Sequence, residues 1–251
     1  IDRGALRKAW GGPTAGQIAQ HIIPDPLLSD KLKSFHPFQT KDDAGDAQKA
    51  LAEMKQSKYE VDGNGVCTDK ACKGIILVAD VRSADKAMLA TVQAGAEKIG
   101  LTFKVRTING AYPIIQTPSK NVPISTRPRW GKDYADPSTF IDPLFNTILK
   151  AGNTNYSLVG ITPAVAKEIG VKGTVTGVPS IAKDAKICAS LTGDARVGCY
   201  ANIDKRLTTE IVPWVPYLWR DQIHIIAPNV TKWSFDQNAG LAGFGHVAVS
   251  G

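Results

Sequence analysis

Strand-like and helical hydrophobic spacing alternate in the first half of the chain, and this pattern predicts an α/β fold. Gly74–Asp80 is a continuous apolar run of strand length, and Leu101–Arg106 alternates between apolar and polar residues. Between these runs, Ser83 is placed to cap a helix with one apolar side, and Gly100 is placed to end it. Strand, helix and strand form a βαβ unit, in which the strands are parallel and the crossover is right-handed.

The same patterns predict elements outside this unit. The expected helices are Gly4–Trp10 behind an Asp2 cap, one that begins at Asp43 or Asp46, Pro137–Lys150 with Asp136 or Ser138 as its cap, Pro163–Ile169, Pro179–Leu191 and Ala195–Val212. The expected short strands are Tyr156–Gly160, Leu218–Ala227 and Val247–Val249. Prolines at positions 24, 26 and 37 exclude a long helix in that region, which is therefore expected to be irregular.

Aromatic, basic and acidic residues crowd into Arg127–Phe145. The predicted helix begins near residue 137, so Trp130, Asp133 and Tyr134 fall on the loop before it. Because loops on a rigid scaffold commonly carry binding residues, this loop is the first candidate for a ligand-facing turn. The same pattern also fits a capped surface helix that follows a solvated loop.

The four cysteines form two close pairs, Cys67 with Cys72 and Cys188 with Cys199. Close spacing predicts two local disulfides, with buried thiols as the alternative, and three pairings are formally open. The spacing does not match the C-x2-C patterns of zinc sites. Disulfides would place the chain in an oxidising compartment outside the cytoplasm.

Composition and motifs exclude several function classes. The chain of 251 residues carries a formal net charge of +7, but its Lys and Arg are scattered among acids, so we expect no nucleic-acid partner. No apolar run approaches the ~20 residues that span a bilayer. The histidines, His21, His36, His224 and His246, lack metal-ligand spacing, and no nucleophile motif accompanies any serine. We therefore expect structural histidines and a protein that is not an enzyme and uses no cofactor or metal.

Four segments carry more specific patterns. Ile1–Gly12 reads I-D-R-G-A-L-R-K-A-W-G-G, Asp46–Tyr59 is a helix followed by tyrosine, Trp130–Phe140 fits W-x-x-D-Y-x-D-P-x-x-F, and Val212–Pro228 contains V-P-W-V-P-Y. In this order they resemble motifs of the family 5 extracellular solute-binding proteins, the peptide and oligopeptide receptors of bacterial ABC importers. The resemblance implies a periplasmic-binding-protein type II-like lobe of α/β class, with a mixed sheet flanked by helices.

The resemblance also implies that the chain is the C-terminal portion of a receptor, since complete members of the family are considerably longer. Residues 1–24 would be a remnant of the connection from the first lobe, 25–212 the C-terminal ligand-binding lobe, and 213–251 the segment that returns toward the first lobe. The missing N-terminal lobe would carry an export signal and a lipid anchor. The implied partners are a peptide or other small solute and an ABC permease, and the implied location is extracytoplasmic.

The family's amine-binding aspartate corresponds to Asp133, which follows Trp130 by three residues. A carboxylate suits this role because its charge-assisted hydrogen bond to the ligand ammonium offsets desolvation of both groups. By the same resemblance, Trp130 would pack on the ligand, and Gly131 and Lys132 would offer main-chain groups to an extended peptide. Lys132 departs from the family, which usually has a small residue there, and its ammonium could pair with Asp133.

The carboxylate end of a peptide would meet Arg127 or Arg129, and the sequence does not choose between them. If the ligand is an oligosaccharide, Trp130, Tyr134 and Tyr112 would serve as stacking platforms. Receptors for metal chelates or haem belong to the same family and stay open as alternatives. A further alternative is an extracytoplasmic sensor or interaction module that keeps the fold without transport.

Overall fold

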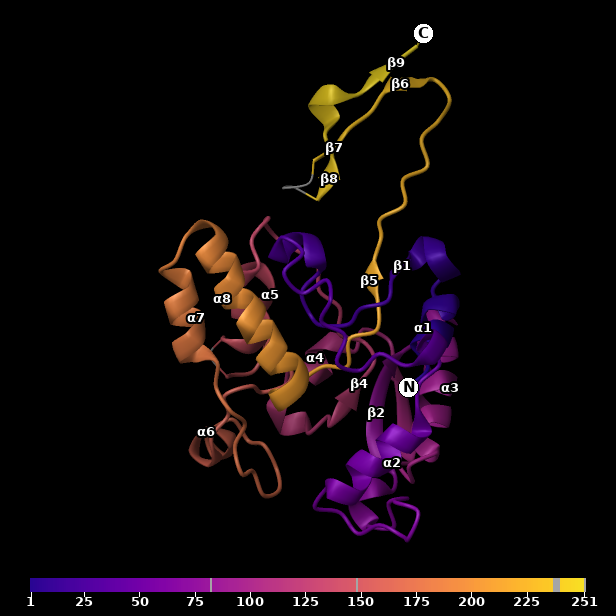
Figure 1. Ribbon diagram of the computed structural model, residues 1–251, viewed down its shortest axis with the longest axis vertical. Helices are drawn as coiled ribbons and strands as arrows, with labels where there is room; N and C mark the ends of the chain where they lie inside the picture. The colour runs from indigo at the N-terminus through magenta and orange to yellow at the C-terminus, as the bar shows by residue number, and fades with distance from the viewer. Residues whose placement is uncertain (82, 148, 237–239, 251) are drawn as a thin grey trace.

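The computed structural model of this chain describes residues 1–81, 83–147, 149–236 and 240–250, with only the backbone of residues 83–85. A three-stranded sheet forms one half of the body, with parallel pairing on both sides of its central strand β2 (Figure 1). Its strands are β2 (Ile75–Asp80), β3 (Phe103–Ile108) and β4 (Ile124–Ser125). Helix α3 (Ser83–Glu97) joins β2 to β3, which confirms the predicted βαβ unit, while the side chain of Ser83 lies outside the described residues.

Both faces of β2 are covered, as its continuous apolar sequence predicts. Leu77 packs with Leu89 of α3 on one face. On the other face, Val78 packs with Ile115 of the short helix α4 (Tyr112–Ile115). The edge strand β3 alternates between half-buried and exposed residues, as its alternating sequence predicts.

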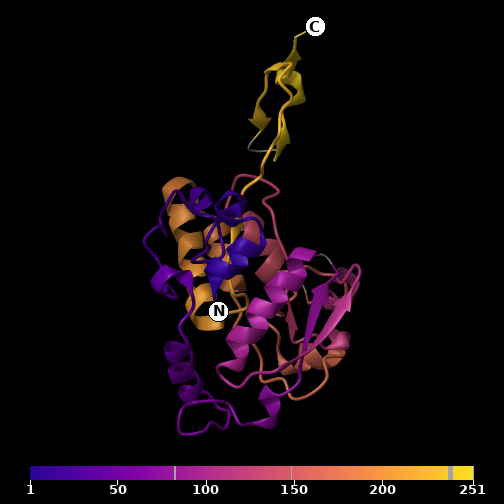
Figure 2. The same ribbon diagram turned by 90° about the vertical axis from the view of Figure 1, so that its right-hand side faces the viewer.

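A separate, helical core fills the other half of the body (Figure 2). Its main elements are η2 (Asp25–Leu28), α5 (Ser138–Phe145), α7 (Ala182–Ala189) and α8 (Gly193–Arg206). Tyr200 of α8 and Phe145 of α5 are the largest of its fully buried side chains. The irregular run before residue 40 packs Ile23, Leu28 and Leu32 into this core, as expected for a proline-rich segment pinned by apolar residues.

Both predicted disulfides are present. Cys188 of α7 is bonded to Cys199 of α8, so the bridge joins two neighbouring helices of the core. Cys67 is bonded to Cys72 and closes the loop that leads into β2. Both bridges confirm the pairing by proximity and exclude buried thiols at these four positions.

Two segments from opposite ends of the chain cross the body side by side. Strand β1 (Gly16–Gln17) pairs antiparallel with β5 (Trp219–Arg220). At Gly16, φ is +143°, and an added Cβ would lie 2.0 Å from the carbonyl oxygen of Trp219. Only glycine allows the two backbones to approach this closely.

After β5 the chain leaves the body as a protruding C-terminal arm, described over residues 221–236 and 240–250 (Figures 1 and 2). The arm contains two small antiparallel pairs, β6 (Val230–Lys232) with β9 (Ala248–Val249) and β7 (Phe235–Asp236) with β8 (Leu241–Ala242). Several of its large apolar side chains are exposed, including Ile225 at 97% and Phe244 at 77%. Exposed apolar side chains that gather in one segment are typical of interaction surfaces.

Most predicted helix starts agree with the structure. The remaining elements are α1 (Arg3–Ala9), η1 (Gly12–Ala15), η3 (Lys41–Asp43), α2 (Ala47–Gln56), η4 (Lys70–Cys72), η5 (Pro118–Lys120), α6 (Pro163–Glu168), η6 (Leu207–Ile211) and η7 (Phe244–His246). Asp2 caps α1 by accepting from the backbone N–H of Ala5 at 2.7 Å, and Asp46 caps α2 in the same way. The π-helical turn η6 continues α8, so the long helix predicted up to residue 212 is confirmed.

The strand predicted at Tyr156–Gly160 is wrong, because a tight turn occupies this segment. The buried side chain of Asn155 accepts from the N–H of Val159 and donates to its carbonyl, each at 3.0 Å. Leu158 and Gly160 have φ of +53° and +86°, which no strand accommodates. A side-chain amide therefore replaces the strand partner that apolar spacing predicts.

Three predicted bounds are also corrected. Only Trp219–Arg220 of the predicted strand Leu218–Ala227 pairs with another strand in the described chain. Helix α7 begins at Ala182, not at residue 179. Helix α5 ends at Phe145, shortly after the internal Pro143, which has no N–H for a helical hydrogen bond. Ile148, inside the longer predicted helix, lies outside the described residues.

Candidate functional site

The order of the parallel strands makes the carboxyl ends of β2 and β4 a topological switch point. The chain passes from β2 to β3 on one side and then returns to β4 on the other side of β2. Helices α3 and α4, which lie in these two connections, pack on opposite faces of β2. Open α/β sheets bind ligands outside the strand ends where the connections diverge in this way. Asp80 ends β2, and the segment that follows β4, residues 126–136, is called the site loop below.

Arg127 of the site loop is bound to the end of β2. Its Nε lies 2.9 Å from Oδ2 of Asp80, and the two side chains are only 17% and 7% exposed. The guanidinium carbon lies 4.4 Å from the centre of the Tyr112 ring, which in turn contacts the ring of Tyr156. Since removing one partner of a buried ion pair leaves an uncompensated charge, Arg127 is strongly held within the chain.

Helix α5 holds the middle of the site loop. The indole Nε1 of Trp130 donates to the carbonyl of Thr139 at 2.8 Å, and the ring packs against the helical core. The backbone N–H of Asp133 donates to the hydroxyl of the same Thr139 at 2.8 Å. Asp133 is exposed, so a buried threonine fixes its backbone while its carboxylate faces solvent. The prediction that Trp130, Asp133 and Tyr134 lie on a loop just before a helix is confirmed.

Asp136 fastens the other end of the site loop to α8. Its two oxygens accept from Nε and Nη2 of Arg196 at 2.8 and 2.9 Å. It also accepts from the backbone N–H and the hydroxyl of Ser138, the first residue of α5, at 2.9 and 2.6 Å. The Arg196 hydrogen bonds lower the pKa of Asp136 to about 2. Asp136 is therefore a structural carboxylate. The cap predicted at Asp136 or Ser138 is wrong, because Pro137 occupies the N-cap position of α5 and no side chain caps the helix there.

The remaining predicted residues are more accessible. Gly131 is exposed and an added Cβ would meet nothing within 4 Å, whereas Lys132 is half-buried. Tyr134 is 47% exposed, and its hydroxyl lies 3.2 Å from that of Ser138. The ring of Tyr112 is covered by the Arg127 guanidinium. The structure thus separates Tyr112 and Arg127, at the strand ends, from the residues of the loop that Thr139 holds.

A third contact joins the site loop to the two crossing segments. The guanidinium carbon of Arg129 lies 4.1 Å from the centre of the Trp10 ring, and that of Arg220 lies 4.8 Å from the same ring. Trp10 ends helix α1 and Arg220 belongs to β5. Sequence reasoning missed Trp10, Arg220, Asp80 and Arg196, because no local pattern links residues so far apart in the chain.

Buried polar atoms without a partner occur at this end of the body. In the part of the chain that the structure describes, Trp10 Nε1, Gln20 Oε1 and Thr126 Oγ1 have no hydrogen-bond partner. Buried polar groups are normally paired, since an unpaired one costs about 1–3 kcal/mol.

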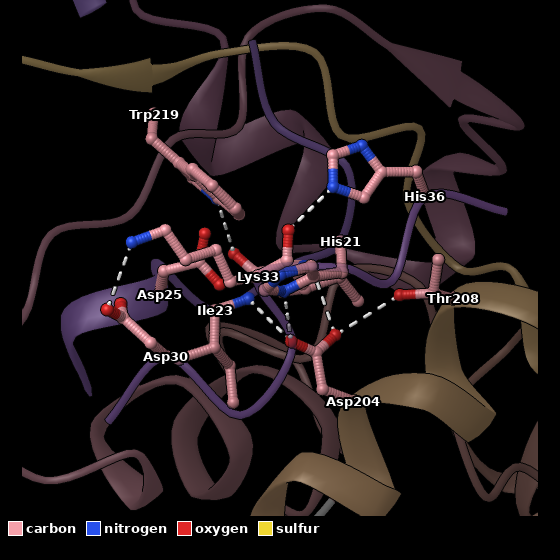
Figure 3. Close-up of polar contacts among 10 residues, drawn as sticks. His21, Ile23, Asp25, Asp30, Lys33, His36, Asp204, Thr208 and Trp219 are labelled. Carbon is pink, nitrogen blue, oxygen red and sulfur yellow. Dashed lines mark hydrogen bonds and ion pairs between the residues drawn. The ribbon is translucent and has the colours of Figure 1, made fainter. Parts of the chain in front are cut away.

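His21, one of the four histidines that the sequence predicts to be structural, lies in a buried polar network (Figure 3). His21 Nδ1 is 2.9 Å from Oδ2 of Asp204, and both side chains are almost fully buried. Asp204 also accepts from the backbone N–H groups of Ile22 and Ile23, at 3.0 and 2.9 Å. The ring of Trp219 lies edge-on to His21, with 4.8 Å between ring centres. This buried network fixes both crossing segments to α8.

Neither a metal site nor a membrane-spanning helix occurs among the described residues. They contain no group of three or more His, Cys, Asp or Glu that could hold a metal ion. Among the same residues, no helix is both long enough and apolar enough to cross a bilayer.

The chain was compared with known proteins. No protein-family model and no curated protein matches it. Solved structures that resemble it include the clavulanic acid biosynthesis oligopeptide binding protein 2 (17% identity, TM-score 0.70), NikA from Brucella suis in complex with Fe(III)-EDTA (17%, 0.65), and AppA from Bacillus subtilis in complex with a nonapeptide (12%, 0.61).

Each of these likenesses covers 100% of this chain but only 42%, 46% and 46% of the respective solved chain. The chain thus spans less than half the length of the structures that it resembles. At this level of identity the likeness shows the fold, which is that of the type II periplasmic binding proteins. The fold class expected from the sequence is confirmed, with parallel pairing in the central sheet and antiparallel pairing in the smaller ones.

Proposed function

We propose that this chain is one lobe of the solute-binding receptor of an ABC importer, with peptides as its ligands. The observation that carries the proposal is the full-length likeness to solute-binding proteins, joined to a site loop at the strand ends where this fold class binds ligands. The neighbours include an oligopeptide binding protein, a protein in complex with a nonapeptide and a murein tripeptide binding protein. We assign no catalytic role, because neither motif nor site geometry supplies a nucleophile with an adjacent base.

The division of the chain follows from this proposal. Residues 25–212 form the ligand-binding lobe, and residues 1–24 and 213–251 connect it with the other lobe. The pairing of β1 with β5 supports this division, since the two connections would cross between lobes side by side. The exposed apolar side chains of the C-terminal arm support it as well, because the missing lobe would cover them.

The site residues receive roles within the proposal. Asp133 binds the ligand α-amine, since its carboxylate is exposed while its backbone is fixed by Thr139. Gly131 and Lys132 offer main-chain groups to an extended peptide. Tyr134 and the half-buried Trp130 form the adjoining wall.

A chelate or opine ligand is the second candidate. Two neighbours were solved with such ligands, NikA with Fe(III)-EDTA and another binding protein with agropinic acid. A sugar ligand is less well supported, because Tyr112, one of its three stacking platforms, is covered by Arg127. The proposed location is extracytoplasmic with a lipid anchor in the complete receptor, supported by the two disulfides. The proposed partner in the membrane is an ABC permease.

The ligand class can be tested by identifying what the receptor carries. The complete receptor is purified under native conditions, denatured, and its released small molecules are identified by mass spectrometry. We expect peptides, enriched over a parallel preparation of the Asp133→Asn variant. A released chelate, opine or sugar, with no peptide, would contradict the peptide assignment while leaving the binding-protein assignment in place.

A further inference from the structure

We propose that Asn109 and Gly110, in the turn that follows β3, form a site of spontaneous deamidation in the folded protein. The sequence contains two Asn-Gly pairs, Asn64–Gly65 and Asn109–Gly110. Both pairs are candidates for this reaction because glycine, which has no Cβ, leaves its backbone nitrogen unhindered. The structure engages the first pair in hydrogen bonds and leaves the second pair open. The inference does not depend on the proposed function, since the reaction needs no ligand.

The reaction requires only the two residues and water. The backbone nitrogen of Gly110 loses its proton and attacks the side-chain carbon Cγ of Asn109, and the Cγ–Nδ2 bond breaks as ammonia leaves. Water then opens the resulting cyclic imide at either carbonyl. Opening at Cγ gives aspartate, and opening at the main-chain carbonyl gives isoaspartate, in which the backbone runs through the former side chain. Both products replace a neutral amide by a carboxylate, and isoaspartate also lengthens the backbone by one carbon.

The surroundings of Asn109 and Gly110 leave both reacting groups free. Both residues are exposed, and a Cβ added to Gly110 would meet nothing within 4 Å. Among the described residues, no hydrogen bond holds the side chain of Asn109 or the N–H of Gly110. The nitrogen of Gly110 can therefore approach Cγ of Asn109 without breaking any contact.

The other pair, Asn64 and Gly65, lies in a tight loop. The N–H of Gly65 donates to the carbonyl of Asp62 at 2.9 Å. The carboxylate of Asp62 accepts from the N–H groups of Asn64 and Val66, each at 2.9 Å. Gly65 is buried, and an added Cβ would lie 2.7 Å from the carbonyl oxygen of Leu51. Reaction at Asn64 therefore requires this loop to open first.

The reactive pair lies at the edge of the sheet that carries the candidate site. Asn109 follows Ile108, which pairs with Asp80 at the end of β2. Ala111 is fully buried at the start of α4, and its carbonyl accepts from two N–H groups of that helix, each at 3.1 Å. An extra backbone carbon before Ala111 would disturb this buried helix start. The new carboxylate would add a negative charge at the same edge of the sheet.

The test follows both asparagines in one protein, so that Asn64 is the matched control for Asn109. The purified protein is incubated at mildly alkaline pH in water enriched in heavy oxygen. One sample is native, and the other is unfolded in urea with its disulfides reduced. Peptide mapping by mass spectrometry then measures how fast each asparagine is converted to a labelled carboxylate.

We expect Asn109 to react at least about tenfold faster than Asn64 in the native protein, because Asn64 must first lose the Gly65 hydrogen bond and open its loop. In the unfolded protein the two rates should become similar, since only the local sequence then acts. If Asn109 reacts no faster than Asn64 in the native protein, or if the ratio of the two rates is the same in both states, the proposal is wrong.

A second measurement tests the effect of the reaction on the fold. Asn109→Gln is the control variant, because the longer side chain closes a larger ring and reacts more slowly. After incubation we expect the unfolding temperature of the wild type to fall further than that of Asn109→Gln. Equal changes in the two proteins, with Asn109 converted in the wild type, would overturn the inferred disturbance of α4.

Discussion

At the scale of single residues, two aspartates of one loop differ in role because their surroundings differ. Asp136 accepts four hydrogen bonds, two of them from Arg196, and its pKa is lowered to about 2. Asp133, three residues earlier, contributes its backbone N–H to a hydrogen bond with Thr139, and its side chain is exposed. The sequence presents both as acids near a helix start. Only the position of Arg196, sixty residues further along the chain, separates the structural carboxylate from the one that is accessible to a ligand.

Replacing Arg196 by Gln should therefore lower stability in a pH-dependent way. A depressed carboxyl pKa stabilises the fold above the ordinary value near 3.8, and this contribution is lost as pH falls toward 2. Because Asp136 is partly solvated, we expect Arg196→Gln to cost about 1–2 kcal/mol at pH 7. Urea unfolding at pH values from 7 down to 2 measures this loss of stability. The difference in unfolding free energy between the variant and the wild type should shrink below pH 4.

The matched control is Arg206→Gln, whose ion pair with Asp184 is more exposed. Its cost should stay below about 1 kcal/mol. An Arg196→Gln protein as stable as the wild type at pH 7, or a difference that does not change with pH, would mean that the Asp136 pair contributes nothing.

At the scale of elements, hydrophobic spacing identified those that are buried along their length. The β2–α3–β3 unit follows from an apolar run, an amphipathic helix and an alternating run, and Asp2 and Asp46 cap their helices as predicted. Spacing fails where a partner outside the segment decides the conformation. Hydrogen bonds from the Asn155 side chain hold the segment predicted as a strand, residues 156–160, in a turn. Residues 221–227 have the hydrophobic spacing of a strand but pair with no other strand in the described chain.

The candidate site also contains residues that the sequence predicts and residues that only the structure identifies. A local motif placed Trp130, Asp133 and Tyr134 on the loop before α5, and the structure agrees. The residues that hold or extend this loop are brought near it by tertiary folding alone, so no spacing rule finds them. They are Trp10, Asp80, Arg196 and Arg220.

The contact between β1 and β5 makes a specific prediction. Replacing Gly16 by Ala puts a Cβ 2.0 Å from the carbonyl oxygen of Trp219, so the two strands must separate. We expect a loss of about 2 kcal/mol or more in the free energy of unfolding, measured by urea titration. Gly12→Ala is the matched control, since Gly12 also has positive φ but nothing lies within 4 Å of the added carbon.

The control isolates the contact from the backbone strain. The φ of +78° at Gly12 alone should cost about 1 kcal/mol. Equal losses for Gly16→Ala and Gly12→Ala would show that close packing of β1 on β5 does not stabilise the fold.

At the scale of the whole molecule, the site loop, the crossing segments and the exit of the C-terminal arm lie together. Trp10 contacts Arg129 of the loop and Arg220 of β5, and the arm begins at the next residue. Beneath them, the network of His21 and Asp204 ties the crossing segments to α8. A ligand held at this end would touch one lobe through the site loop, and the second lobe of the proposed receptor would close over it.

The central claim is that the carboxylate of Asp133 binds the α-amine of a peptide ligand. The most direct measurement titrates the complete receptor and its Asp133→Asn variant with one peptide and its N-acetylated form. We expect the wild type to bind the free amine more tightly by several kcal/mol, because acetylation removes the ammonium charge and leaves the Asp133 carboxylate without its counter-ion. The variant should lose this preference while its stability changes by less than about 1 kcal/mol. Equal affinity of the wild type for both forms, or an unaffected variant, would contradict the account.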